Sequence, residues 1–297
     1  MGVHGSQVSA RRLARTVQRL AGQRYSEAER ESARRAVAEM LADAGWQLAT
    51  APGGTMDERT GINLIARHPD GREDGPRIVI GAHIDTCADT PGADDNASGV
   101  AGLVELAHVL NDQPIAARVE LVAFDLEESS GPAAGSGAYV ASLTGRDASL
   151  EVALILEMIG YRCATPGCQT TVSAVADCLE VGVPDMDVGT YVAAVGNPAA
   201  RGWVRALADV EPTAYTCDGF FVNPIVVADD GRCFPDARRS DNAAFWDAGL
   251  PAVMIVDTAN LRNPHYHGTG DQPGTLDYGF LADVVRAVAG AVSELEA

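Results

Sequence analysis

The chain has 297 residues, of which 46% are hydrophobic and 21% charged, so it has the apolar content of an ordinary globular protein and is neither disordered, collagenous nor a coiled coil. Its 41 acidic and 22 basic side chains give a formal net charge of -19, which repels nucleic acid and anionic lipid alike. The longest apolar runs have the length of buried strands and fall short of the ~18 residues that a bilayer span requires. We therefore expect no nucleic-acid partner and no membrane partner.

The N-terminal region predicts a surface helix. Leu13, Val17 and Leu20 recur at helical spacing, so one face can pack on the protein while neighbouring arginines stay in water. The continuous apolar stretch of a secretory signal is missing from this pattern. A cytoplasmic location is the expectation that follows.

The six cysteines contain no CxxC pair and are sparse for the length of the chain, which indicates neither a disulfide framework nor a thiolate zinc site. Reduced thiols are the default expectation. Cys163 and Cys168 are near enough in sequence to close a short bridge if the protein were exported.

Further along the chain, helical and strand patterns alternate. A capping box formed by Ser26 and Glu29 begins a helix that ends near Gly45. We then expect a single domain over residues 1–297, an α/β/α sandwich of three layers with a mixed, largely parallel central sheet. Its expected strands are 63–67, 77–81, 119–126, 152–156, 189–195 and 252–256, and its later helices are 97–110, 199–209, 240–248 and a C-terminal one marked by Leu281, Val284, Val288 and Val292.

Polar side chains follow three of these strands directly. His83 follows one apolar run, Glu127 and Glu128 follow the next, and Glu157 follows a third. Because ligands bind at the carboxyl ends of strands in open α/β sheets, these side chains should converge at one edge. Several carboxylates in one crevice need a counter-charge, and oxygen together with imidazole ligands suits a divalent, zinc-like metal.

The segment around His83 has a second acid at a useful spacing. Asp85 lies two residues further on, and in an extended segment such residues point to the same side. Asp85 can then accept the second imidazole N–H of His83 and fix the tautomer of a metal ligand. The alternative is a strand-end histidine with an aspartate that merely caps the turn.

A glycine-flanked turn at residues 92–99 contains two adjacent aspartates before a helix. Asp95 or Asn96 can act as the N-cap of that helix. Such a cap explains one of these residues and leaves Asp94 free, so Asp94 is the candidate metal ligand of this turn.

The adjacent acids Glu127 and Glu128 leave their strand in different directions. One can bind metal while the other faces the substrate water as a general base, which is the division that metal-assisted hydrolysis requires. Two solvated glutamates are the alternative. In a later loop rich in proline and glycine, His265 and His267 are both candidate ligands.

Taken together, these segments resemble the co-catalytic two-zinc aminopeptidases of the bacterial leucyl aminopeptidase type, which are related to glutamate carboxypeptidase-like enzymes and glutaminyl cyclases. The resemblance covers roughly residues 60–280. The matching segments, in order, are GAHIDT at 81, PGADDNASG at 91, DLEES at 125, LEMIGY at 156, SDNAAFWDAGLPAVMIVDT at 240 and NPHYHGTGD at 263.

The resemblance implies two zinc ions (Zn2+) per chain. In the family pattern, His83 pairs with Glu157 at one metal and Glu128 pairs with His267 at the other. Asp94 would bridge the two metals, and a cis peptide bond would join Asp94 to Asp95. The same pattern makes Glu127 the general base and leaves His265 as a competitor of His267.

Two segments depart from the family pattern. The loop after His267 reads GlyThrGlyAsp where many relatives have ThrPro, and Asn242 stands where relatives often carry histidine. Both loops line the rim in the family, so these departures bear on substrate contacts. Asp241 has two readings, an orienting group behind the metal centre or the N-cap of the helix that follows.

The function that these patterns favour is a two-zinc metallohydrolase, most simply an aminopeptidase acting on short peptides. The alternatives are a carboxypeptidase, an amidohydrolase acting on N-acyl amino acids or small amides, and a one-zinc glutaminyl cyclase. A catalytically inactive binding domain is a further alternative, although Glu127 and the full set of candidate ligands are present. The oligomeric state is left open by the sequence.

Overall fold

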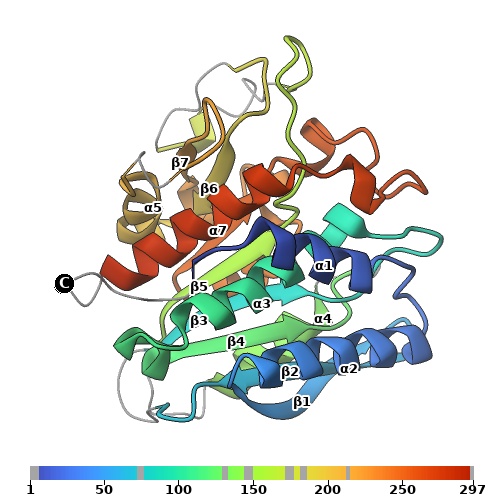
Figure 1. The fold of residues 1–297 in the computed structure, drawn as a ribbon. Coiled ribbons are helices and arrows are strands. Elements are labelled where there is room, and N and C mark those ends of the chain that lie inside the picture. The colour runs from blue at the N-terminus through green and yellow to red at the C-terminus, as the bar shows by residue number, and fades with distance from the viewer. Residues whose placement is uncertain are drawn as a thin grey trace.

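A mixed β-sheet organises the computed structural model, which describes residues 7–71, 77–128, 133–143, 150–170, 177–180, 186–211 and 215–294. The sheet has eight strands in the order β1-β2-β4-β3-β5-β8-β6-β7 (Figure 1). Pairing is parallel in β4-β3-β5-β8 and in β6-β7, and antiparallel elsewhere. The strands are β1 (Gln47–Met56), β2 (Arg59–Arg67), β3 (Arg77–His83), β4 (Val119–Phe124), β5 (Leu150–Glu157), β6 (Val192–Gly196), β7 (Val222–Val226) and β8 (Ala252–Val256).

Helices cover both faces of this sheet. The α-helices are α1 (Ala10–Leu20), α2 (Glu27–Asp43), α3 (Gly99–Leu110), α4 (Ala134–Leu143), α5 (Arg201–Ala208), α6 (Asn242–Asp247) and α7 (Tyr278–Ser293). The buried hydrophobic residues of α1, α2, α3, α5 and α7 belong to one hydrophobic cluster, and those of α4 and α6 belong to a second one. The expected sandwich of three layers with a mixed sheet is thereby confirmed.

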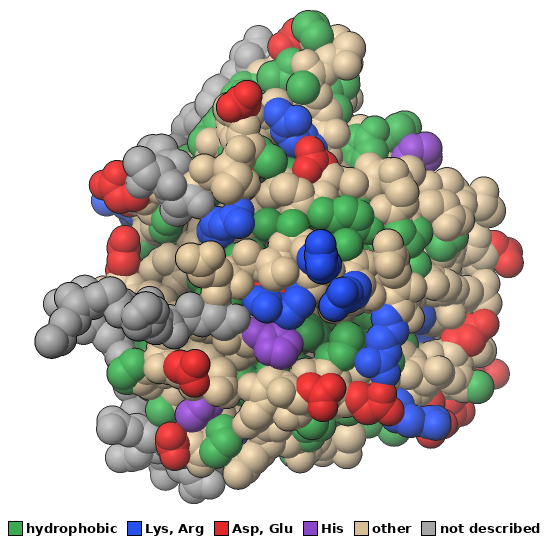
Figure 2. Space-filling model, in the orientation of Figure 1, with side chains coloured by type: hydrophobic (Ala, Val, Ile, Leu, Met, Phe, Trp, Pro, Cys, Tyr) green, Lys and Arg blue, Asp and Glu red, His purple; other side chains and the backbone are tan. Residues whose placement is uncertain are grey.

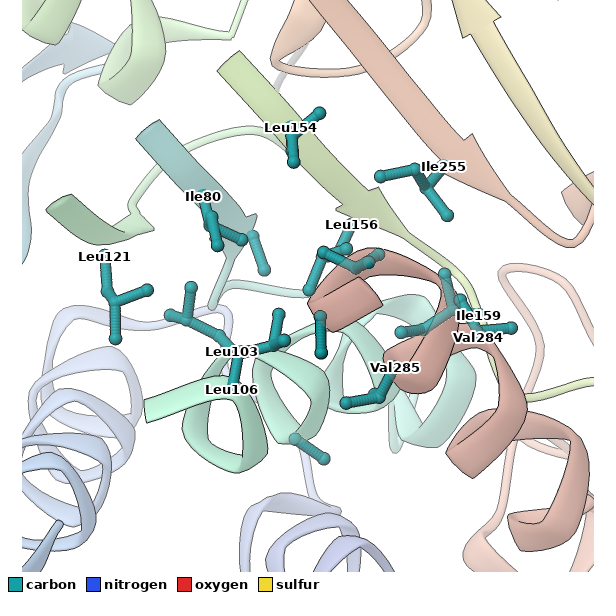
Figure 3. Packing of buried hydrophobic residues seen from close by; sticks show 14 of the residues in the cluster. Ile80, Leu103, Leu106, Leu121, Leu154, Leu156, Ile159, Ile255, Val284 and Val285 are labelled. Atoms are coloured by element: carbon teal, nitrogen blue, oxygen red, sulfur yellow. The ribbon is translucent and has the colours of Figure 1, made fainter. Parts of the chain in front are cut away.

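The two clusters follow from the alternation of side chains along each strand. In β3, Ile78 and Ile80 face the first cluster while Val79 faces the second. Because both faces are covered, the central strands are mostly apolar on both sides. Glu120 of β4 is a buried exception, and its carboxylate is paired with Arg67 and Tyr139. Figure 3 shows Leu103 and Leu106 of α3 near Ile80 of β3, within the first cluster.

The expected elements are largely present. The capping box at Ser26 and Glu29 forms as predicted and begins α2. The later helices and six of the strands also lie where the pattern places them, with ends that differ by a few residues. Strands β1 and β7 have no counterpart among the expected elements.

The N-terminal helix packs as expected. Leu13, Val17 and Leu20 of α1 are buried, and Arg11 and Arg15 are exposed. On the face shown in Figure 2, basic side chains gather around the middle, where Figure 1 places α1. No helix in the described ranges is long and apolar enough to cross a bilayer.

The cysteines divide into two groups. Cys163 and Cys168 form a disulfide bond, so the default expectation of reduced thiols is wrong for this pair. The remaining cysteines are free thiols, namely Cys87, Cys178, Cys217 and Cys233.

Candidate metal centre

The candidate site lies where neighbouring parallel strands end. His83 is the last residue of β3, and Glu157 is the last residue of β5, the strand beside it. Glu127 and Glu128 follow β4 on the other side of β3. The parallel register therefore brings three sequence-distant segments to one edge, as the sequence predicts.

His83 forms one half of the site, which we call the His83 half. Its Nε2 is 3.3 Å from Glu157 Oε2 and 3.4 Å from Asp95 Oδ1. Glu127 Oε2 lies further away, at 3.9 Å from the same nitrogen. This Nε2 is buried and completes no hydrogen bond within the described residues, although three carboxylates face it.

His267 forms the other half, the His267 half. Its Nε2 is 3.2 Å from Glu128 Oε1 and 3.2 Å from Asp95 Oδ2. The two oxygens of Asp95 therefore face different histidines. This is the arrangement of a carboxylate that bridges two cations, because each oxygen can serve a separate ion.

Asp94 does not occupy the bridging place that the sequence analysis gives it. Its Oδ1 accepts from the backbone N–H of Gly160 (2.9 Å) and its Oδ2 accepts from Asn263 Nδ2 (2.7 Å). Burial and the nearby carboxylates of Asp257 and Asp271 raise its pKa well above the usual range. Asp94 is thus hydrogen-bonded to the protein, and its neighbour Asp95 faces the histidines.

The hydrogen bonds of the turn before α3 explain why Asp95, and not Asp94, faces the histidines. The cap at this turn is Asn96, whose Oδ1 accepts from Gly99 N (3.0 Å) and Met158 N (3.1 Å). Since Asn96 has this role, Asp95 is released to face the site. The cis peptide bond joins Asp95 to Asn96, one residue later than the predicted bond between Asp94 and Asp95.

Asp85 is fully buried behind His83 and does more than the predicted contact. Its carboxylate is 3.5 Å from His83 Nδ1, and its backbone oxygen is 3.2 Å from the same atom. Its two carboxylate oxygens also accept from Glu127 N (3.1 Å) and Glu128 N (3.0 Å). One buried carboxylate therefore fixes the position of three site residues.

The segment before α6 supports the His83 half. Ser240 Oγ donates to Glu157 Oε2 at 2.7 Å. Asp241 is fully buried and stands at the N-cap position of α6, but its side chain makes no cap hydrogen bond to the helix. Burial raises the pKa of Asp241 to about 7, against the opposing charge of His83. Asn242 is also fully buried, so it does not line the rim as the family pattern implies.

His265 lies apart from both halves of the site. Its ring meets the ring of Tyr161 edge-on at 6.3 Å, and its backbone N–H donates to Asn263 Oδ1. No candidate metal group within the described residues contains it. Of the two histidines that the sequence leaves open, His267 is the one that reaches the carboxylates.

The electrostatics of the cluster call for a cation. Burial raises the pKa of Glu127 well above its usual value, with Glu128 and Glu157 adding to the effect against the charge of His83. Burial opposes protonation of His267, but its hydrogen bonds to Asp95, Cys87 and Glu128 raise its pKa to about 12. Shared protons or a nearby positive charge stabilise such a group of carboxylates. Divalent ions supply the positive charge without protonating the ligands.

Several supporting residues were not singled out by the sequence analysis. The carboxylate of Asp271 accepts from Asp94 N (2.8 Å) and Asp95 N (3.1 Å) and so holds the turn. Arg24 is buried and donates to five backbone carbonyls, while its charge acts on Asp85, Asp95 and Glu128. Asp271 ends the family-like segment at 263–271, but nothing in that segment indicates its contact with the distant turn, and Arg24 lies outside every matching segment.

Fold and site together define a class of protein: an α/β enzyme with a buried histidine and carboxylate centre for metal ions at the carboxyl edge of its sheet. Comparison with known proteins then gives the family. Residues 63–183 match peptidase family M28. The chain is 35% identical over 237 residues to the uncharacterized protein YfbL of Escherichia coli (strain K12), covering 76% of this chain and 68% of that protein.

The chain is also similar to a curated aminopeptidase and to two solved structures. The probable lipoprotein aminopeptidase LpqL of Mycobacterium tuberculosis is 32% identical over 209 residues, which is 68% of this chain and 36% of LpqL. The solved structure of the Legionella pneumophila LapA aminopeptidase superposes with a TM-score of 0.71 at 16% identity, over 97% of this chain and 72% of LapA. The Macrostomum lignano glutaminyl cyclase gives a TM-score of 0.71 at 18% identity, over 100% of this chain and 94% of that one.

The chain belongs to peptidase family M28, a zinc-dependent family, and is a metallopeptidase of that family. It spans only part of the length of its curated relatives, about a third in the case of LpqL. These two structural neighbours have low sequence identity, so they establish the fold only. The reaction has to be inferred from the residues of the site.

Proposed function

We propose that the protein is an exopeptidase with two zinc ions, which removes the N-terminal residue of short peptides. The observation that carries this proposal is the position of Asp95, with one oxygen 3.4 Å from His83 Nε2 and the other 3.2 Å from His267 Nε2. With Glu157 on the first side and Glu128 on the second, each half offers one imidazole and two carboxylates. This donor set suits a pair of zinc ions, since zinc accepts nitrogen and oxygen ligands.

Zinc fits the site on a second ground. His83 Nε2 is a buried ring nitrogen without a completed hydrogen bond in the described part of the chain, and it is aimed at carboxylates. A ligand nitrogen has this environment when its partner is a metal ion. Bound in the two halves, zinc ions would lower the pKa of water and polarise the carbonyl group of the scissile bond.

Glu127 is the residue we assign to proton transfer. It is adjacent to Glu128 but lies 3.9 Å from His83 Nε2, outside the shorter contacts that Asp95 and Glu157 make. Its backbone N–H is fixed by Asp85, so the carboxylate has a defined position at the centre. Glu127 would accept the proton of the attacking water and pass it to the leaving amine.

The remaining residues position these groups. Asp85 and Ser240 restrain His83 and Glu157, and Asp271 restrains the turn that carries Asp95. Because the supporting groups are themselves buried and hydrogen-bonded, the centre is preorganised for charge that develops during hydrolysis.

The test combines metal content with substrate choice. The chelated protein should be inactive, and activity on an aminoacyl p-nitroanilide should return as zinc approaches two equivalents per chain. An N-acetylated form of the same substrate should resist cleavage. Saturation at one equivalent, or equal cleavage of the acetylated substrate, would contradict the proposal, and conversion of a glutaminyl peptide to its cyclic product would indicate a cyclase.

A further inference from the structure

The thiol of Cys87 lies within the metal centre and has no part in the chemistry proposed above. Its Sγ donates to Glu128 Oε2 at 3.0 Å and lies 3.6 Å from His267 Nδ1. Cys87, Glu128 and His267 also form one of the side-chain groups that could hold a metal ion, with donor atoms within 4.8 Å of one another. The thiol therefore contacts two residues of the His267 half, Glu128 and His267.

Cys87 contacts those atoms of His267 and Glu128 that a bound metal ion would leave free. His267 presents Nε2 to Asp95 and Glu128, and Nδ1 to the thiol. Glu128 presents Oε1 to His267, and Oε2 to the thiol. A metal-bound histidine ordinarily donates its second ring N–H to a supporting acceptor, and here the sulfur of Cys87 stands at that place.

The His83 half has a different support at the corresponding place. There the carboxylate of Asp85, at 3.5 Å from Nδ1, stands behind the ring. Sulfur is a weak hydrogen-bond acceptor, whereas a carboxylate is a strong one. The two halves of the centre are thus supported unequally.

We propose that Cys87 is a positioning residue that orients His267 and Glu128 and sets the affinity of their metal ion without binding that ion. This inference rests on the two-metal function proposed above. It follows that the His267 half releases its ion before the His83 half does.

Zinc retention against a chelator tests the role directly. Wild-type protein loaded with zinc, and the variants Cys87→Ala and Cys87→Ser, are dialysed against increasing chelator and analysed for metal. Cys87→Ala should lose one of its two ions at a chelator concentration roughly 10- to 100-fold lower than wild type does, the range found for supporting groups of metal ligands. Cys87→Ser should restore retention, since its hydroxyl both donates and accepts.

The matched control is Cys217→Ala, a free thiol whose backbone N–H bonds to Asp283 away from the metal centre. It should retain both ions as wild type does. If Cys87→Ala holds both ions as tightly as wild type, the positioning role is wrong. If wild type itself never takes up two ions, the proposed function fails first, and the two failures are distinguished.

Cobalt substitution separates a supporting thiol from a ligating one. Cobalt-loaded wild type should show no sulfur-to-cobalt charge-transfer absorption, and its spectrum should match that of cobalt-loaded Cys87→Ser. A band present in wild type and missing from the variant would make Cys87 a metal ligand and would overturn the supporting role.

Cys178 and Cys233 are two further free thiols, and neither is a residue of the metal centre. Cys178 Sγ lies 3.0 Å from the backbone oxygen of Cys233. Leu179 pairs with Val227, and Glu180 N donates to Val226 O at 2.8 Å, so residues 177–180 are aligned beside the end of β7. The side chain of Cys233 is exposed, so an oxidant can reach it.

From this alignment we infer that Cys178 and Cys233 form a second disulfide bond when a disulfide oxidant such as oxidised glutathione is present. One thiolate attacks the oxidant and releases a glutathione thiol. The other cysteine then displaces the second glutathione, so two protons and two electrons leave the protein as the bond forms.

Counting thiols in the denatured protein tests this bond. The four free cysteines should fall to two after incubation with oxidised glutathione. Cys178→Ser and Cys233→Ser should each retain one reactive partner thiol or carry a glutathione adduct, and Cys217→Ser should still form the bond. Four thiols remaining in oxidised wild type, or a stable glutathione adduct in it, would overturn the inference.

Discussion

The two halves of the metal centre are built in different ways. His83 and Glu157 are the last residues of adjacent strands, and the side chain of His83 is 1% exposed. His267 lies in a loop with a positive φ of 54°, and its side chain is 35% exposed. A strand end fixes a ligand through the sheet itself, whereas a loop ligand depends on the side chains around it.

This difference indicates a division of labour. The His83 half is held by Asp85, Ser240 and the sheet, so it should keep its ion and its shape. The His267 half opens toward solvent, which is where a substrate can enter and where an ion can leave.

Glu127→Gln should have the largest effect, because Glu127 is the proposed base for the reaction that both halves serve. Removing a general base lowers turnover by about 10²- to 10⁴-fold. Both metal ions should be retained, since Glu127 lies outside the shorter contacts around His83. Steady-state kinetics and metal analysis on the same sample provide the check. Unchanged turnover would assign the base to another residue.

Asp95→Asn should weaken metal binding in both halves at once, because each oxygen of Asp95 faces a different histidine. The matched variant is Asp94→Asn, whose carboxylate bonds to Gly160 and Asn263 instead. We expect zinc content to fall well below two equivalents in the first variant and to stay near two in the second. The reverse outcome would return the bridging role to Asp94.

His267→Ala should remove one ion and leave the other, whereas His265→Ala should leave both. His267 contacts Asp95 and Glu128 at 3.2 Å, while His265 packs on Tyr161. Zinc analysis after dialysis distinguishes the two variants. Loss of both ions from His267→Ala would mean that the halves bind metal as one unit and that the contrast between them has no functional weight.

The smallest expected effect is on the pH dependence of the metal-free protein. The pKa of His267 is raised to about 12 in the folded state, above the value of ~6.5 in an unfolded chain. Protonated His267 therefore contributes its full share of the free energy of unfolding below pH ~6.5. This contribution is lost as the pH rises through the folded pKa. Because the ring is partly exposed, solvent screening keeps the effect under about 1 kcal/mol.

Thermal melting from pH 6 to pH 10 checks this prediction. Over that range, the melting temperature of metal-free wild type should fall by roughly 2 °C more than that of metal-free His267→Gln. A change of ~1 kcal/mol shifts the melting midpoint of a chain of this size by only a few degrees. Equal pH profiles for the two proteins would remove His267 from the stability of the metal-free state. Zinc should abolish the difference in wild type, because the ion replaces the proton.

Much of the fold and part of the site follow from the sequence for a local reason. The apolar runs that end at His83 and Glu157 identify both the strand and the ligand that ends it, because parallel strands present their carboxyl ends together. Strand β1 escapes prediction because it is antiparallel at the edge of the sheet and largely exposed, with an irregular register between Pro52 and Thr55. An edge strand of that kind has little hydrophobic signal.

The choice between Asp94 and Asp95 is not a local matter. It depends on Asn263, which is 169 residues away and bonds to Asp94, and on Asn96, which takes the cap. The cap of Asn96 has a spacing that the sequence does suggest, but the bond of Asn263 to Asp94 has none that a pattern can detect. Cys87 is missed for a similar reason, because a single thiol signals nothing until the fold sets it beside Glu128 and His267.

Asp271 has a consequence for how the centre responds to change. It belongs to the loop that carries His267, and its carboxylate accepts hydrogen bonds from the backbone N–H groups of Asp94 and Asp95. A lengthened or shortened loop would therefore displace the ring of His267 and loosen the shared carboxylate together. Variation among relatives should spare the spacing between these two positions even where the outer surface of the loop is free to diverge.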